Sequence, residues 1–127
     1  MKISIRIGGI LNLLLGVFHF AFWEIFNWPK SLECLSPDNS AILQVLNIHG
    51  AITILFFAYV SLFHTTELIE TKIGRGVAYF IAFFYLIRIA NEFLFWGMTI
   101  ESLVTAIILL LLALLYILPM KQMKIVR

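Results

Sequence analysis

The chain has 127 residues, of which 62% are hydrophobic and only 13% are charged, and its net charge is +2. Soluble domains carry roughly a quarter charged residues and just under half apolar ones, so the composition excludes an ordinary water-soluble domain. The single cysteine, Cys34, excludes an internal disulfide, a CxxC redox pair and a thiolate zinc site within one chain. The length leaves room for one transmembrane domain over residues 1–127, and nothing indicates nucleic-acid binding.

The first half of the chain predicts two membrane spans. An apolar run gives the first span, over residues 5–27, and it is longer than the apolar region of a signal peptide. Ser36, Pro37 and Asp38 then form a helix start, with an N-cap, a proline at the first helical position and an acid in the first turn. The second span is therefore expected over residues 38–63.

The second half predicts two more spans. Residues 65–76 form a polar loop in which Gly74 and Gly76 interrupt the helical pattern. The third span is expected over residues 77–97 and the fourth over 99–118, where Pro119 ends it before a short basic tail, 120–127. Each of the four runs is long enough, because a helix needs about 20 residues to cross a bilayer.

Short connections and the distribution of charge predict topology and orientation. Neighbouring spans joined by short loops pack antiparallel, so the expected fold is an all-α, four-helix, up-down-up-down membrane bundle. One side carries most of the basic residues, Lys2, Arg6, Lys72, Arg75, Lys121, Lys124 and Arg127, and the other only Lys30. By the positive-inside rule both termini are cytoplasmic, which leaves Trp23, Trp28 and Trp96 at the outward ends. The small size and the basic tail favour a bacterial inner membrane.

Polar residues inside the first two spans are candidates for function, because ionisable groups are costly in a membrane. At 100° per residue, one stripe of the first span contains Gly8, Asn12, Gly16, His19 and Trp23. We interpret Gly8 and Gly16 as packing positions and His19 as a candidate site residue. Glu24 lies about 140° around the helix from His19. In the second span Asn47 and His49 lie on different faces, so only one of them is expected to face the centre.

The third span contributes Arg88, Asn91 and Glu92 at i, i+3 and i+4, hence on one face. A simple interpretation is an Arg88–Glu92 ion pair, which still leaves guanidinium donors free. At 1.5 Å per residue, His19, His49 and Arg88 all lie about 12–13 Å from the outward ends of their helices. We therefore expect a polar pocket that opens outward, above a cytoplasmic half that is almost wholly apolar. The fourth span is expected to pack or face lipid.

The preferred hypothesis is a site for a small amphiphile, lipid-like, sterol-like or quinone-like, that serves transport or proton transfer. The candidate ligand-binding residues are His19, Glu24, Asn47, His49, Arg88, Asn91 and Glu92. Arg88 would hold an anionic or carbonyl oxygen, and His19 would handle a proton with Glu92 or Glu24.

Two alternatives stay open. His19 and His49 could be the axial ligands of a b-type haem, or could hold a metal ion together with Glu92. The chain could also be an accessory subunit without a site of its own, in a homo-oligomer or a larger membrane complex. No sequence motif assigns a catalytic residue or a resident metal.

Overall fold

The computed structural model describes residues 1–122, which form helices and loops without any strand. The four long helices are α1 (Lys2–Phe20), α4 (Pro37–Phe63), α6 (Lys72–Trp96) and α7 (Ile100–Gln122). The short helices are α2 (Phe22–Ile25), α3 (Trp28–Ser31), the 3-10 helix η1 (Leu32–Cys34) and α5 (Thr65–Glu70). All four long helices are long and apolar enough to cross a membrane, as the sequence predicts.

The outer surface of the helices is apolar. On α7, for example, Val104, Ile107 and Leu111 are all more than half exposed. Soluble monomers rarely expose large contiguous apolar patches, and a helix that is apolar all round is typical of a membrane span. This surface is therefore compatible with a multi-pass membrane protein.

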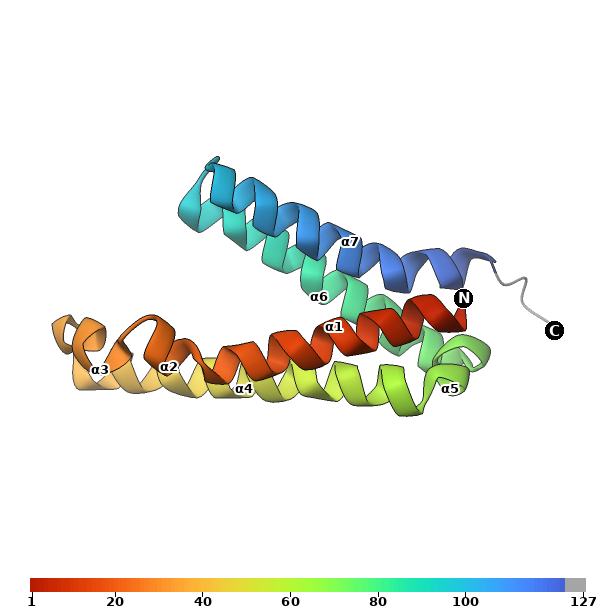
Figure 1. The fold of residues 1–127 in the computed structure, drawn as a ribbon, viewed down its shortest axis with the longest axis horizontal. Coiled ribbons are helices and arrows are strands. Elements are labelled where there is room, and N and C mark those ends of the chain that lie inside the picture. Colours follow the sequence, from red (N-terminus) through yellow and green to blue (C-terminus); the bar gives the residue numbers. More distant parts are fainter. Residues whose placement is uncertain (123–127) are drawn as a thin grey trace.

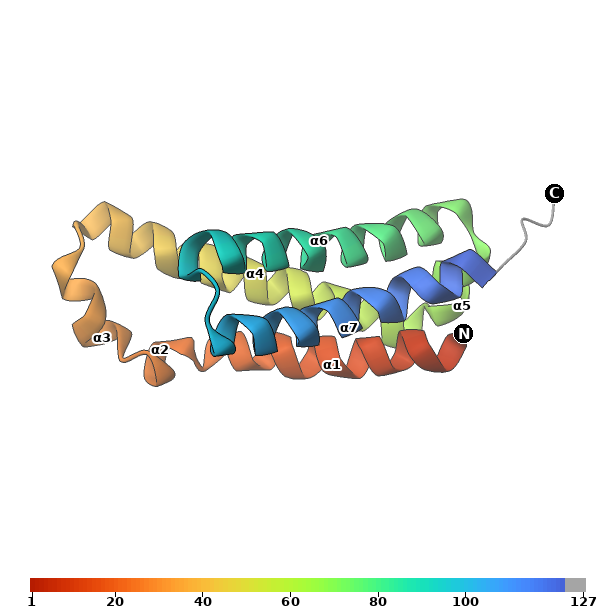
Figure 2. The ribbon, with the colours of Figure 1, turned by 90° about the horizontal axis from the view of Figure 1, so that it is seen from above.

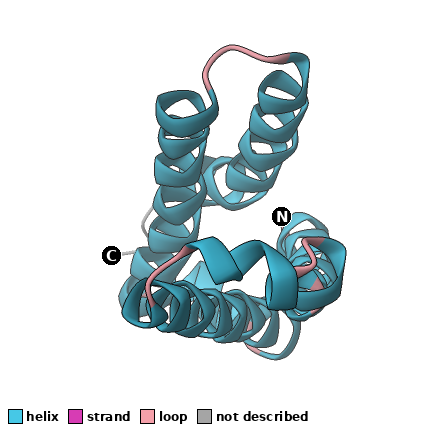
Figure 3. Ribbon diagram, turned by 90° about the vertical axis from the view of Figure 1, so that its left-hand side faces the viewer, coloured by secondary structure: helices cyan, strands magenta, loops and turns pink. Residues whose placement is uncertain are grey.

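The long helices associate in two pairs that diverge from each other. Helix α1 lies along α4, and α6 lies along α7 (Figure 1). The pairs meet at the end that carries Lys2 and α5, called the α5 end here, and separate toward the end that carries α3 and Gly97, called the α3 end (Figures 1 and 2). Seen from the α3 end, the α6–α7 loop stands well away from the α1–α4 pair (Figure 3). The molecule is thus wedge-shaped.

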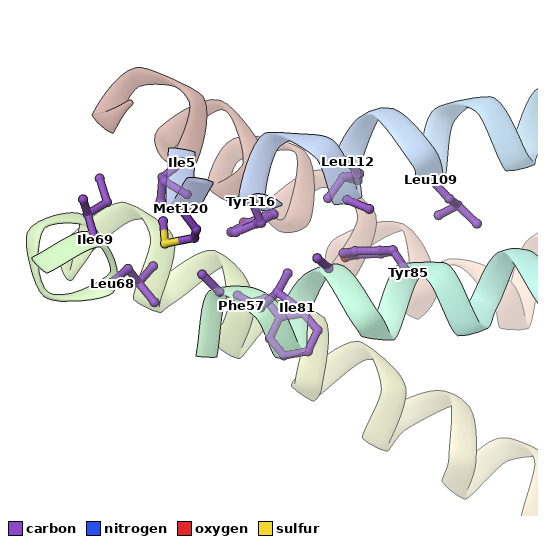
Figure 4. Packing of buried hydrophobic residues seen from close by; sticks show 13 residues of the cluster. Ile5, Phe57, Leu68, Ile69, Ile81, Tyr85, Leu109, Leu112, Tyr116 and Met120 are labelled. Atoms are coloured by element: carbon purple, nitrogen blue, oxygen red, sulfur yellow. The ribbon is translucent and has the colours of Figure 1, made fainter. Parts of the chain in front are cut away.

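The hydrophobic core lies where the two pairs meet. Every long helix contributes to it, with Ile5 from α1, Phe57 from α4, Ile81 from α6 and Leu112 from α7 (Figure 4). The α1 glycines permit this close packing, because a Cβ at Gly8 would come within 2.8 Å of the Tyr116 ring. A Cβ at Gly16 would likewise come within 2.7 Å of Leu55 on α4. The predicted packing role of these glycines is confirmed.

A buried polar network crosses this core, so the prediction of an almost wholly apolar half at this end is wrong. We call it the polar tetrad: Asn12, Ser61, Tyr85 and Tyr116, one residue from each long helix. Asn12 Nδ2 donates to Tyr116 Oη over 2.7 Å, and Tyr85 Oη donates to Asn12 Oδ1. Ser61 donates to the Phe57 carbonyl, so its oxygen accepts from Tyr116 Oη, 2.7 Å away. Asn12 of the α1–α4 pair thereby bonds to both helices of the α6–α7 pair, and Ser61 bonds to one of them.

The first long helix ends before the C-terminal end of the first predicted span. Helix α1 ends at Phe20 instead of continuing to residue 27, and the Ala21 N–H bonds to the Phe18 carbonyl in a tighter turn. The break releases the His19 carbonyl, which accepts a hydrogen bond from Asn47 Nδ2 at 2.9 Å. An interhelical bond therefore replaces one that a continuous helix would have made.

The second span is close to its prediction, whereas the ends of the last two differ. Helix α4 begins at Pro37, and Ser36 Oγ accepts from the Asn39 N–H at 3.3 Å as its N-cap. Helix α6 already begins at Lys72, because Thr71 caps it by accepting from the Gly74 N–H. Pro119 does not end α7, which continues to Gln122. Most of the predicted basic tail, residues 123–127, lies outside the described residues.

Gly74 and Gly76 therefore lie inside α6, where they offer a matched test of packing. A Cβ at Gly74 would overlap the Glu67 carbonyl of α5, whereas a Cβ at Gly76 would meet nothing within 4 Å. Gly74→Ala is expected to cost about 1–3 kcal/mol through overpacking. Gly76→Ala should be neutral or stabilising by up to about 1 kcal/mol, the difference in helix propensity. Unfolding by SDS titration from mixed micelles measures both, and equal effects would show that α5 does not pack on α6.

Candidate functional site

An open cleft of about 720 Å³ lies between the two helix pairs toward the α3 end. It is bounded by α1 with α2 and α3 on one side, by α4 beneath them, and by α6 opposite. Its lining residues are His19, Phe22, Phe26, Trp28, Leu43, Leu46, Asn47, Gly50, Arg88, Asn91, Phe95 and Trp96. Most of these are aromatic or aliphatic, and a few polar side chains interrupt the apolar wall, as is typical of small-molecule sites.

Arg88 is the only lining side chain with a permanent charge, because a guanidinium is not deprotonated in proteins. Its Nη1 lies 2.7 Å from Glu92 Oε2, and its guanidinium carbon lies 5.2 Å from the centre of the Trp96 ring. Nη1 is nevertheless buried without a hydrogen bond, so the two groups are close but their N–H···O alignment is poor. The predicted Arg88–Glu92 ion pair is present, and it leaves Arg88 with donor capacity.

His19 reaches the cleft from the last turn of α1. Its Nδ1 lies 2.7 Å from the Leu15 carbonyl, and since a carbonyl can only accept, Nδ1 must carry a proton. The ring stacks on Phe22, with centroids 4.6 Å apart. Nε2 is therefore the ring nitrogen left for a ligand, as an acceptor in the neutral imidazole and as a donor in the protonated form.

The structure resolves the competition between Asn47 and His49. Asn47 lines the cleft and donates to the His19 carbonyl, which leaves its amide oxygen as an acceptor. His49 is exposed and is not among the lining residues, and its Nδ1 donates to the Val45 carbonyl at 2.8 Å. Asn47 thus belongs to the cleft and His49 to another face of α4.

The seven candidate residues divide into two groups. Four line the cleft: His19, Asn47, Arg88 and Asn91. The other three, Glu24, His49 and Glu92, do not line it. Glu24 is exposed on α2 beyond the break in α1, whereas Glu92 is 7% exposed and reaches the cleft only through its ion pair with Arg88.

The aromatic wall of the cleft was not assigned from sequence. Phe22 with Phe26, and Asn91 with Phe95, are i, i+4 pairs that could have indicated a common face. In a chain with twelve phenylalanines that signal is weak, because phenylalanine equally suits lipid contact.

The geometry constrains the chemistry of the site. Among residues 1–122 His19 forms no ion pair with Glu24 or Glu92, so the expected proton-handling pairs are not assembled. The described part of the chain also contains no group of three or more His, Cys, Asp and Glu side chains that could hold a metal ion. Of the histidines His19 and His49, only His19 lines the cleft.

Comparison of the chain with protein-family models, curated proteins and solved structures gives no match.

Proposed function

We propose that this protein binds a small amphiphile, lipid-like, sterol-like or quinone-like, whose anionic or carbonyl oxygen is held by Arg88. The observation that carries the proposal is the guanidinium of Arg88, which lines a largely apolar cleft, is 40% exposed and is paired with Glu92 through Nη1 alone. The guanidinium has five N–H donors, so those that do not face Glu92 are left for an acceptor on a ligand. The aromatic wall would accommodate the apolar body of the same molecule.

The membrane setting makes an anionic oxygen the favoured partner. Glu92 pairs with one guanidinium nitrogen of Arg88, and the Arg88 side chain, which lines the cleft, is still 40% exposed. A guanidinium is planar and presents five donors in a fork, which matches a carboxylate or phosphate better than an ammonium would. Asn91 and the Nε2 of His19 would supply further polar contacts to the same head group.

We also propose the orientation in which this cleft operates. The four spans would run up-down-up-down with both termini in the cytoplasm, because Lys2, Lys72 and Arg75 gather at the α5 end. Trp28 and Trp96 at the α3 end would then mark the outer interface, and the cleft would open to the outer leaflet. A bacterial inner membrane remains the proposed location.

The alternatives receive less support from the geometry. A haem held by His19 and His49 would need both rings on one face, whereas only His19 lines the cleft. An accessory role without a site would need all the polar groups to be satisfied by helix packing. The Arg88 side chain, in contrast, is still 40% exposed after it pairs with Glu92.

The proposal predicts a site that discriminates the charge of the ligand. Trp28 and Trp96 line the cleft, so an amphiphile that carries a bromine near its head group should quench their fluorescence when it binds. In nanodiscs of zwitterionic lipid, a brominated fatty acid should bind saturably and about tenfold or more tighter than a trimethylammonium analogue with the same chain. Charge-assisted hydrogen bonds of about 1.5–3 kcal/mol give a difference of this order. Equal, unsaturable quenching by both would mean that the amphiphiles only partition into the bilayer.

A further inference from the structure

A second hollow adjoins the cleft and shares two residues with it. This groove of about 240 Å³ runs along α6, and its lining residues are Phe80, Phe83, Phe84, Ile87, Arg88 and Asn91. Arg88 and Asn91 also line the cleft, so the groove and the cleft meet at the same polar pair. Away from that pair, the groove is entirely apolar.

The groove extends from Arg88 toward the α5 end. Phe80 lies eight residues before Arg88, which places it about 12 Å further along the helix axis. Phe84 is fixed against Phe57 of α4 in an edge-to-face contact with centroids 5.1 Å apart, which gives the groove a rigid wall. Phe80, Phe83 and Ile87 are about half exposed, so the groove is open to the bilayer along its length.

We infer that the groove holds one hydrocarbon chain of the amphiphile whose anionic head is bound by Arg88. This inference rests on the proposed function. It specifies one orientation of the ligand, with the head group at Arg88 and Asn91 and the hydrocarbon chain directed toward the α5 end. The groove has a third of the volume of the cleft, 240 against 720 Å³, which suits the narrow part of such a molecule. The charge of Arg88 selects the end of the ligand that lies at the junction.

The hydrocarbon chain of the ligand is expected to determine the orientation of the bound molecule and to add little to its affinity. Lipid tails are as apolar as the groove, so moving a chain from the bilayer into it changes little apolar hydration. A chain-length series would therefore be a poor test. The location of the chain end is the informative observation.

The experiment uses a fatty acid that carries a diazirine near its methyl end. The full-length protein in nanodiscs is irradiated in its presence, so that the diazirine labels the residues near the end of the hydrocarbon chain. Labelling should concentrate on the α6 segment that contains Phe80 and Phe83, at least about fivefold above the level given by a trimethylammonium analogue with the same chain and diazirine. Ile87→Trp, which fills the groove beside Arg88, should remove this excess. Leu86→Trp is the matched control, because Leu86 is similarly exposed on the same helix but does not line the groove, and it should retain the excess.

The outcomes separate this inference from the proposed function. Labelling spread evenly over the exposed faces of α4, α6 and α7, together with charge-selective tryptophan quenching, would overturn the chain position and leave the head-group site in place. The same holds if both tryptophan variants lose the excess labelling equally. Loss of charge selectivity in the quenching experiment would instead overturn the proposed function, and the chain position with it.

Discussion

Replacing Asn12 with leucine is expected to lower the free energy of unfolding by about 1–3 kcal/mol, a large change for a single polar substitution. Leucine has the same branching at Cγ as asparagine but can neither accept from Tyr85 Oη nor donate to Tyr116 Oη. In this variant Tyr116 still donates to Ser61. Tyr85 is a buried residue, only 1% exposed, and its hydroxyl loses its acceptor. SDS titration followed by tryptophan fluorescence measures the change.

A second substitution in the same network provides the control. Removing both partners of a buried hydrogen bond costs much less than removing one, because no orphaned polar group remains. Asn12→Leu combined with Tyr85→Phe should therefore recover much of the stability that Asn12→Leu alone loses. Additive losses, or a wild-type value for Asn12→Leu, would show that the polar tetrad does not hold the two helix pairs together.

The elements of the fold could be predicted because each depends on local sequence. Long apolar runs predict spans, and the Ser36–Pro37 start of α4 follows from capping chemistry within four residues. The helix ends that differ from the ends of the predicted spans depend on contacts with distant parts of the chain. Asn47 of α4 satisfies the carbonyl released where α1 breaks, and the α5 backbone packs against Gly74. Neither partner is visible in the local sequence.

The site could be predicted only to the level of helix faces. Periodicity placed Arg88, Asn91 and Glu92 on one side of α6, but the helix pairs diverge at an angle that no single helix encodes. The rotation of α6 about its own axis places Asn91 in the cleft and leaves Glu92, the next residue, outside it. For the same reason the sequence could not decide between Asn47 and His49. Nor could it show that Tyr85 and Tyr116 meet Asn12, because this needs the relative rotation of three helices.

Replacing Arg88 with glutamine is expected to reduce affinity for the carboxylate amphiphile by about tenfold to a hundredfold, the largest binding effect we expect. Glutamine keeps a donor but loses the charge and the forked geometry of the guanidinium. Arg88→Lys keeps the charge without the fork, so its affinity should lie between the wild-type and glutamine values. The affinity of the trimethylammonium analogue should not fall in either variant. Saturable quenching of the cleft tryptophans measures the affinity of each variant for each of the two amphiphiles.

The interpretation of Arg88→Gln depends on what happens to Glu92, which lies 2.7 Å away and is itself 7% exposed. Removing one partner of a fully buried ion pair costs about 3–5 kcal/mol, and the cost here should be smaller because Arg88 is partly exposed. A loss of binding in the single variant could thus reflect a displaced carboxylate. Arg88→Gln with Glu92→Gln removes both charges, so it should regain stability while its affinity for the carboxylate stays low. Wild-type affinity in this double variant would show that the cleft does not use Arg88 to bind the head group.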